Sequence, residues 1–338
     1  MFDLRSDTVT RPTPAMREAM ATAEVGDDVF GEDPTVVRLQ ERAARILGKA
    51  AALFVPSGTM GNQVCLGALT RPGDEVIAEA QAHVLLNEAG SVARLWGCQI
   101  APVAGLRGAP PPAAVEATIR EPDEHHPHTA VLSLENTHNY AGGAVLPLET
   151  VDALTALARR RGLRVHMDGA RLFNAQVASG VPVARIARDA DLVSVCLSKG
   201  LGAPVGSVVA GSQELISVCH RLRKGLGGGM RQAGVIAAAG LLALEEGPAL
   251  LAADHRRARA LAEALAELPG LHVDPASVET NIVFVETPDD AAGWQQRLEQ
   301  RGVLAMALAP RRLRFVFHRD VGDDALVAAI GACRALAR

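Results

Sequence analysis

Aromatic side chains are scarce in this sequence, since Phe, Trp and Tyr make up 3% of its 338 residues. So few rings argue against a surface that stacks the bases of single-stranded nucleic acid. An excess of one charge is also missing: 34 Lys and Arg residues face 38 Asp and Glu residues, which gives a formal net charge of −4. This balance argues against a broad surface for nucleic acid or anionic membranes, and it leaves room for a local basic pocket.

Long hydrophobic runs and paired cysteines are missing as well. No uninterrupted apolar run approaches the roughly 20 residues that span a bilayer, and Asp3, Arg5 and Asp7 stand where a signal peptide needs its apolar core. The 5 cysteines are scattered and show no CxxC spacing, a pattern typical of reduced, buried thiols. We therefore expect a cytoplasmic protein with no disulfide framework, no membrane partner and no nucleic-acid partner.

Hydrophobic residues are abundant at 49%, and charged residues make up 21%, a composition that excludes an intrinsically disordered chain. Apolar runs of strand length alternate with amphipathic segments of helical period through most of the chain. The expected strands are 51–55, 75–78, 130–134, 163–167, 192–197 and 205–210, and the expected helices include 34–47, 148–161 and 213–223. Short apolar strands separated by helices predict an α/β fold, with a mostly parallel sheet sandwiched by helices.

This pattern changes near residue 245. A long Ala-, Leu- and Arg-rich helix over 248–268 is followed by strand runs and helices, which predicts a smaller α+β unit. The expected organisation is a large domain over 1–247 and a small carboxy-terminal domain over 248–338. Residues 1–30 hold few strand signals and two prolines, so we expect them to form an arm of the large domain that wraps another part of the structure.

Two of the expected strands end at side chains that carry chemistry. Asp168 ends one strand, and Lys199 follows the next strand along the chain. Taken alone, the aspartate could be a helix N-cap and the lysine an exposed loop residue. Both side chains could reach one ligand, because parallel strands gather binding residues at their carboxyl ends. An amine that binds an aldehyde and a carboxylate that keeps a pyridine nitrogen protonated are the groups that pyridoxal phosphate needs most.

Further candidates accompany this pair. Gly58 and Thr59 open an apolar helix after a strand, and free N–H groups at a helix start can hold a phosphate. His83 follows the strand 75–78, where it could stack on a cofactor ring and act as a base, although a lone histidine is more often a surface or core residue. Arg314 begins an apolar run and could bind a carboxylate, unless it belongs to a plain basic turn.

Two other segments have less specific patterns. A histidine cluster, His125, His126 and His128, precedes the strand 130–134, but the adjacent pair lacks the spacing of metal ligands on a helix, so we expect no metal. Lys224 and Arg231 flank a run of glycines that allows close approach of the backbone to an anion.

Seven motifs together resemble the low-specificity L-threonine aldolases. The motifs are SDTVTRPT (6–13), GDDVFGEDPTV (26–36), SGTMGN (57–62), LENTHN (134–139), DGARLFNA (168–175), LSKGLGAPVGS (197–207) and GGGMRQAG (227–234). They occur in order and cover nearly the whole chain, from about residue 3 to about residue 320. The resemblance implies a pyridoxal-phosphate enzyme of the aspartate-aminotransferase fold. Such an enzyme cleaves L-threonine, L-allo-threonine and related β-hydroxy-α-amino acids to glycine and an aldehyde.

The resemblance also implies a role for each candidate residue. Lys199 would hold the cofactor covalently, and Asp168 would pair with the ring nitrogen. The remaining cofactor contacts would be His83 over the ring, Gly58 and Thr59 at the phosphate, Arg171 near the ring O3, and Lys224 and Arg231 reaching across a dimer. The substrate carboxylate would meet Ser6, Arg171 and Arg314, and His125 would assist proton transfer beside His83. Relatives of this kind are typically homotetramers built as dimers of dimers.

Two departures from the family pattern leave substrate preference open. Phe30 stands where a tyrosine is common, and Asn87 stands where relatives can carry an aromatic residue. Among competing functions, a β-eliminating pyridoxal-phosphate lyase acting on aromatic amino acids would use the same cofactor contacts. A non-catalytic cofactor-binding protein has less support, because the catalytic set looks complete. A nucleotide-binding dehydrogenase lacks its GxGxxG after the first strand.

Overall fold

The computed structural model describes residues 1–337. Within these residues, 7 strands form a central sheet in the order β2-β8-β7-β6-β5-β3-β4. Their bounds are β2 Ala51–Val55, β3 Glu75–Glu79, β4 Gln99–Val103, β5 Thr129–Glu135, β6 Arg164–Asp168, β7 Leu192–Cys196 and β8 Ser207–Gly211. Neighbouring strands are parallel except where β8 pairs with β2 and with β7. The predicted α/β class and the mostly parallel sheet are therefore confirmed.

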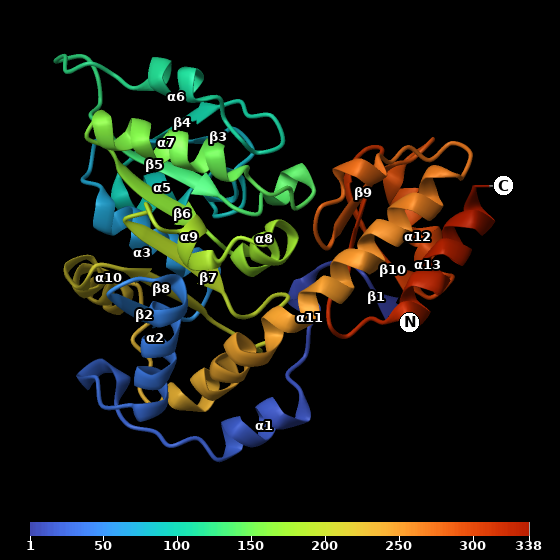
Figure 1. Ribbon diagram of the computed structural model, residues 1–338, viewed down its shortest axis with the longest axis horizontal. Helices are drawn as coiled ribbons and strands as arrows, with labels where there is room; N and C mark the ends of the chain where they lie inside the picture. The colour runs from blue at the N-terminus through green and yellow to red at the C-terminus, as the bar shows by residue number, and fades with distance from the viewer. Residues whose placement is uncertain (338) are drawn as a thin grey trace.

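Helices cover both faces of this sheet (Figure 1). Alternate residues of β2 show why: Phe54 belongs to one hydrophobic core, and Leu53 and Val55 belong to the other, as the two-residue period of a strand requires. The first core includes side chains from α2 (Pro34–Leu47), α7 (Leu148–Arg160) and α8 (Leu172–Ser179). The second includes side chains from α3 (Gly58–Leu69), α5 (Ser91–Trp96) and α10 (Gln213–Gly225). Shorter helices are α4 (His83–Leu86), α6 (Pro112–Thr118) and α9 (Val183–Ile186).

One strand of the sheet, β4, is missing from the expectations drawn from the sequence. It carries Pro102, and its residues alternate irregularly between exposed and buried positions. A proline cannot donate to a strand ladder, so it lowers the strand signal of a sequence. Pro102 is tolerated because β4 lies at the edge of the sheet, where it pairs only with β3 among the described strands.

The long helix α11 (Gly234–Ala266) joins the large unit to the smaller one (Figure 1). It begins 14 residues before the expected start at Pro248, so the proline lies inside the helix instead of opening it. Leu251 packs in a core of the large unit and Ala258 in that of the small unit. The boundary expected between residues 247 and 248 therefore falls within one continuous helix. By length and composition α11 could cross a membrane, but it packs against α1, α2 and α8.

The smaller unit is an α+β structure. Its antiparallel sheet has the order β11-β12-β9, with β9 Ile282–Glu286, β11 Met306–Ala309 and β12 Arg312–Val316. The helices α12 (Ala291–Glu299) and α13 (Asp323–Leu336) share its hydrophobic core with the second half of α11. Trp294 is the largest fully buried side chain there.

The amino-terminal segment wraps its own chain. β1 (Phe2–Asp3) pairs in parallel with β10 (Val303–Leu304) in the smaller unit. The chain then passes through a short 3-10 helix, η1 (Asp7–Val9), and reaches α1 (Pro14–Ala21), which packs on α11. We did not expect α1, because prolines stand at its start. Pro14 opens the helix and Thr13 caps it, accepting a hydrogen bond from the Met16 N–H.

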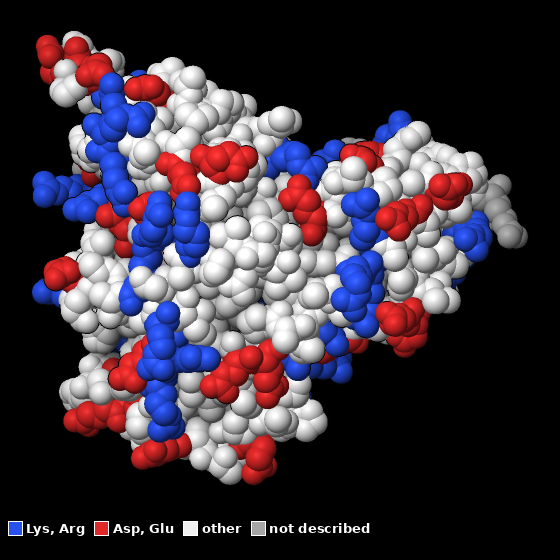
Figure 2. Space-filling model, viewed as in Figure 1, with Lys and Arg blue, Asp and Glu red and all other residues white. Residues whose placement is uncertain are grey.

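Charged side chains on the face drawn in Figure 2 are mixed in sign. Arginine and lysine side chains form a column there, and acidic side chains lie beside it along its length. Several exposed arginines form ion pairs: Arg159 pairs with Asp189 at 2.6 Å, and Arg164 pairs with Asp191 at 2.9 Å.

Asp33 provides a test of how the large unit is held together. Its buried carboxylate caps α2 by accepting from the N–H groups of Thr35 and Val36, and it also accepts from the Gly234 N–H at the start of α11. Asp33→Ala should lower the free energy of unfolding by about 2 kcal/mol or more, because the cap is lost and a buried N–H is left unpaired. Urea unfolding measures this change. The matched control is Asp290→Ala at the exposed cap of α12, which should cost about 1 kcal/mol or less; equal losses in the two variants would contradict the account.

Candidate active site

A cavity of about 290 Å³ lies at the edge of the central sheet where β2, β6 and β7 end. Its lining brings together side chains from widely separated segments. They are Thr8, Pro56, Ser57, Gly58, Thr59, Asn62, His83, Asp168, Ala170, Cys196, Ser198, Lys199, Pro204, Val205 and Gly206. The expected residues Gly58, Thr59, His83, Asp168 and Lys199 therefore share one cavity, as the rule for parallel strands predicts.

Asp168 and Lys199 meet here because β6 and β7 are neighbours. Asp168 lies beside Ser194 in the ladder, and Lys199 follows β7 directly. The Asp168 carboxylate accepts hydrogen bonds from the Ala170 N–H at 3.0 Å and from Asn62 Nδ2 at 2.8 Å. Burial alone would raise the pKa of Asp168, but the charges of His83 and Lys199 outweigh it and lower that pKa. The carboxylate is thus held negative at neutral pH.

The amino-terminal end of α3 forms another side of the cavity. Ser57 caps this helix by accepting from the Met60 N–H at 3.1 Å, and Gly58 and Thr59 follow it. A Cβ at Gly58 would lie 2.6 Å from the sulfur of Cys196, so no larger side chain fits without a shift. Gly58 and Thr59 line the cavity, and the first N–H groups of a helix have no partner within it, so they can bind an anion here.

His83 is held by polar groups that the sequence did not single out. Its Nδ1 lies 2.9 Å from Oε1 of Glu88, and its backbone N–H donates to Glu135 at 2.7 Å. Burial alone would lower the pKa of His83, but the hydrogen bond to Glu88 and the charge of Asp168 outweigh it and raise that pKa. The role of Glu88 could not be read from the sequence, because a glutamate in an exposed-looking turn gives no local signal of burial.

A buried ion pair anchors the amino-terminal segment in the site. The Arg171 guanidinium donates from Nε and Nη2 to the two carboxylate oxygens of Asp7, each at 2.7 Å. Its Nη1 donates to Asn139 Oδ1 at 3.3 Å. This pair joins residues 164 positions apart in the chain, and it places Thr8 in the cavity lining. Asp7 is not among the expected site residues, because a contact between residues 164 positions apart leaves no local signal in the sequence.

Arg314 approaches the same region from β12. Its Nη2 donates to the backbone oxygen of Arg5 at 3.0 Å, and its Nε has no hydrogen-bond partner within the described residues. Burial and the nearby charge of Arg171 lower the pKa of Arg314. A buried guanidinium with a free N–H is suited to bind a carboxylate. Ser6 is also buried in this segment, where its hydroxyl oxygen accepts from Thr8.

Six expected residues are absent from the lining of this cavity within the described chain: Ser6, Arg171 and Arg314, whose contacts are given above, and His125, Lys224 and Arg231. His125 is exposed in the loop before β5, so it lies at the amino end of a strand whose other end faces the site. Within a single chain its expected role in proton transfer therefore has no support. Lys224 is near the end of α10, and Arg231 pairs with Asp27 at 2.9 Å. Their expected contact across a dimer stays a prediction.

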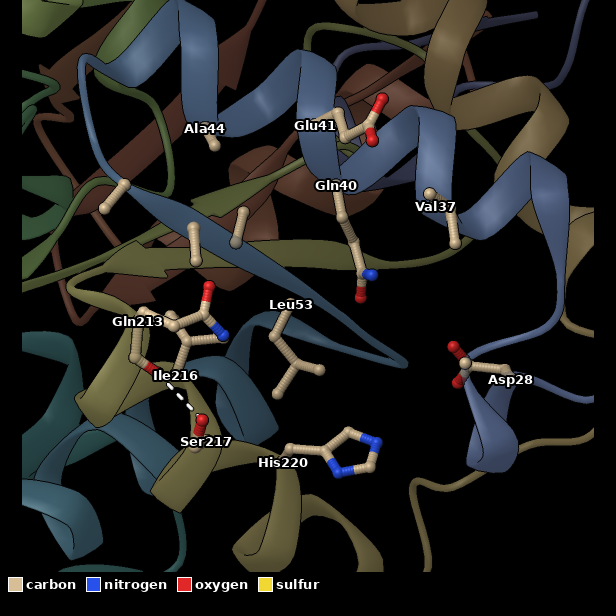
Figure 3. Close-up of a pocket in the computed structure, with 14 residues that line it drawn as sticks. Asp28, Val37, Gln40, Glu41, Ala44, Leu53, Gln213, Ile216, Ser217 and His220 are labelled. Atoms are coloured by element: carbon tan, nitrogen blue, oxygen red, sulfur yellow. Dashed lines mark hydrogen bonds between the residues drawn. The ribbon is translucent and has the colours of Figure 1, made fainter.

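A larger cavity of about 470 Å³ lies elsewhere, between α2 and α10 beside the edge strand β2 (Figure 3). Asp28 and His220 face it, together with Gln40, Glu41 and Leu53. It contains none of the side chains that follow β6 and β7, and it has no lysine in its lining. We therefore assign the chemistry to the smaller cavity.

The donor set around the smaller cavity fits pyridoxal phosphate. Lys199 offers an amine for its aldehyde, Asp168 a carboxylate for its ring nitrogen, and the start of α3 offers N–H groups for its phosphate. The ligand atoms of His83, Glu88 and Asp168 also lie within 4.8 Å of one another and could hold a metal ion. Because Asn62 Nδ2 already donates to both carboxylates, we interpret these groups as a hydrogen-bonded network.

Comparisons with known proteins agree with this arrangement. The profile of the beta-eliminating lyase family matches residues 3–288. Low-specificity L-threonine aldolase 1 of Arabidopsis thaliana is 47% identical over 327 residues, which cover 94% of this chain and 91% of the relative. This chain belongs to the low-specificity L-threonine aldolases. The family expected from the motifs is thereby confirmed.

Two further relatives extend the comparison. The low specificity L-threonine aldolase of Escherichia coli (strain K12) is 45% identical over 328 residues, and these cover 96% of each chain. Among solved structures, the threonine aldolase of Leishmania major superposes with a TM-score of 0.86 over the full length of both chains, at 19% identity. At that identity the superposition supports the fold alone.

The Asp7–Arg171 pair makes stability depend on pH. Burial would raise the pKa of Asp7, but Arg171 lowers it to about 2. Because the folded pKa is depressed, the contribution of the carboxylate is complete above the ordinary aspartate value of about 4 and disappears as the pH falls toward 2. Asp7→Asn should lose about 3 kcal/mol of unfolding free energy at pH 6, since Arg171 is left unpaired. Urea unfolding at several pH values should show this loss shrinking below pH 4.

Asp152→Asn is a suitable control, because Asp152 pairs with Arg185 at 2.5 Å in a partly exposed position. That substitution should cost about 1 kcal/mol or less. An Asp7→Asn variant as stable as the control at pH 6 would contradict the assignment of a buried, strongly coupled pair.

Proposed function

We propose that this protein is a pyridoxal-phosphate-dependent lyase that cleaves L-threonine, L-allo-threonine and related β-hydroxy-α-amino acids to glycine and an aldehyde. The observation that carries this proposal is the meeting of the Lys199 amine, the Asp168 carboxylate and the His83 ring around one cavity. Family membership supports the same reaction, since the relatives of 45–47% identity are low-specificity L-threonine aldolases.

The bound cofactor supplies an electron sink for the pair of electrons left when the Cα–Cβ bond breaks. Asp168 supports that chemistry by holding a proton on the ring nitrogen, which its lowered pKa and fixed hydrogen bonds permit. Lys199 would hold the cofactor through its amine. The Asp168 carboxylate is fixed by its hydrogen bonds before the substrate arrives.

The substrate is oriented and deprotonated by other side chains. Arg314, with Ser6 close to it on the amino-terminal segment, holds the substrate carboxylate. By holding the carboxylate, these residues would orient the Cα–Cβ bond for cleavage, and the bound cofactor would supply the electron sink. His83 takes the proton of the β-hydroxyl group, which becomes the carbonyl of the aldehyde, and a proton then added at Cα gives glycine.

The oligomer and the location belong to the same proposal. The Asp28–Arg223 and Asp27–Arg231 pairs fix the last turn of α10, which contains Lys224, and the glycine-rich loop that follows it. Phe30 lies beside this loop and is 73% exposed, which supports contact with a second copy. We infer that two copies form a dimer, in which Lys224 and Arg231 of each copy contribute to the cofactor site of the other. Two of these dimers would form a homotetramer. The free, buried cysteines support a cytoplasmic location.

Lys199→Ala tests the proposal most simply. Without the amine, formation of glycine from threonine should fall by more than the roughly 10²–10⁴-fold that a general base contributes. Lys49→Ala is the matched control, because Lys49 donates only to the backbone oxygens of Arg188 and Ala190, outside the cavity lining. A coupled assay for acetaldehyde measures both variants. Turnover by Lys199→Ala at the wild-type rate would refute the scheme.

His83→Ala should be impaired by roughly 10²–10⁴-fold in kcat/KM, because general base assistance is lost while the cofactor contacts remain. Product analysis of the same reactions separates this function from a β-eliminating lyase. An aldolase forms glycine from threonine, whereas a β-eliminating enzyme forms a keto acid and ammonia. A wild-type enzyme that gave only the second pair of products would overturn the proposal.

A further inference from the structure

Glu88 is a buried carboxylate that contacts a residue of the cofactor cavity, His83. Its side chain is fully buried, and it follows α4 at the end of the turn that carries His83. Its Oε2 accepts from Gln63 Nε2 at 2.6 Å, and the oxygen of the same Gln63 amide accepts from Trp96 Nε1 at 3.2 Å. Gln63 and Trp96 therefore fix the orientation of the Glu88 carboxylate, so that its other oxygen stays directed at His83.

The other oxygen of Glu88 faces the catalytic groups. Oε1 lies 2.9 Å from His83 Nδ1 and accepts from Asn62 Nδ2 at 2.8 Å. Since a carboxylate oxygen accepts hydrogen bonds, the proton shared with His83 lies on Nδ1. A neutral imidazole carries only one such proton, so its Nε2 is left with a free electron pair. His83 lines the cavity, and Nε2 has no hydrogen-bond partner within the described residues.

Asn62 connects this arrangement to the opposite side of the cofactor site. The same Nδ2 group donates to Asp168 Oδ2 at 2.8 Å, so one buried amide bridges the two carboxylates. Both contacts need the nitrogen on this side, because carboxylate oxygens only accept. Three charged groups act on the pKa of His83: Glu88, Asp168 and Lys199. A fourth, the Glu135 carboxylate, accepts a hydrogen bond from the backbone N–H of His83.

We propose that Glu88 is a positioning residue, which fixes His83 with its Nδ1–H directed at Glu88 and leaves Nε2 as the nitrogen that accepts the substrate proton. This inference rests on the proposed function, since it assigns the proton transfer to His83. Carboxylates that orient a histidine through its second nitrogen have the same effect in metal sites and in catalytic triads.

Replacement by glutamine tests this role with little change of shape. In Glu88→Gln, the charged acceptor is replaced by an amide that can present either its oxygen or its NH2 group to Nδ1. The orientation of the ring proton is then no longer fixed, and kcat should fall about 10- to 100-fold while KM changes far less. The pH profile gives the specific readout. Because the contact with Glu88 raises the pKa of His83 and burial lowers it, the acid limb of kcat/KM should move to lower pH in this variant. A carboxylate with only a structural role would leave the limb in place.

A second readout does not need turnover. Nitrogen-15 NMR of sedimented holoenzyme labelled at histidine distinguishes a protonated ring nitrogen from a free one, and the His83 signals are those lost in His83→Asn. The wild-type enzyme should show the Nδ1–H form, and Glu88→Gln should show a mixture of both forms. Glu75→Gln is the matched control, since Glu75 is equally buried but lies at the far end of β3 with Arg120 and Gln99. It should leave both the His83 signals and the pH profile unchanged.

Two results would overturn the inference. One is a folded Glu88→Gln enzyme with wild-type His83 signals and a wild-type pH profile. The other is a wild-type spectrum with the proton on Nε2, which decides the matter even if Glu88→Gln does not fold. Failure of the proposed function is a separate result: the wild-type enzyme would then form no glycine from threonine, whatever the state of His83.

Discussion

The side-by-side pairing of β6 and β7 is the constraint on which the site depends. Asp168 and Ser194 are partners in this parallel ladder, so the carboxylate and the lysine that follows β7 reach the same edge of the sheet. Lys199 can bind the aldehyde of the cofactor and Asp168 can pair with its ring nitrogen, and pyridoxal phosphate needs both contacts at once. Residues that follow β2 and β3 arrive at this edge because these strands run in the same direction as β6 and β7. Thr8 arrives on the amino-terminal segment, which the Asp7–Arg171 pair holds in place.

The site is completed by contacts that span great distances in sequence. Asp7 reaches Arg171, and Thr10 donates to the backbone oxygen of Lys199, so the first residues of the chain bind directly to the catalytic edge. β1 and Arg314 tie the same segment to the smaller unit. A change in the packing of the smaller unit would therefore move Arg314 and the amino-terminal segment, which the proposed function assigns to binding of the substrate carboxylate.

Much of this arrangement could be predicted from the sequence, and the reasons are local. Apolar runs in the sequence predict where the strands lie. A charged residue directly after a parallel strand lies at the carboxyl edge of the sheet, and this rule identified Asp168 and Lys199. Glu88 and Asn62 were missed because their pairing joins segments 26 residues apart and leaves no periodic signal. His125 precedes β5, so within a single chain it lies at the edge of the sheet opposite Lys199, and its expected role stays a prediction.

Covalent attachment of the cofactor to one amine is the central claim, and chemical reduction tests it directly. The holoenzyme is treated with borohydride, digested and analysed by mass spectrometry. The account predicts a single peptide that carries the reduced cofactor on Lys199, with Lys49 and Lys224 unmodified. Cofactor found on another lysine, or a protein that borohydride cannot label at all, would contradict it.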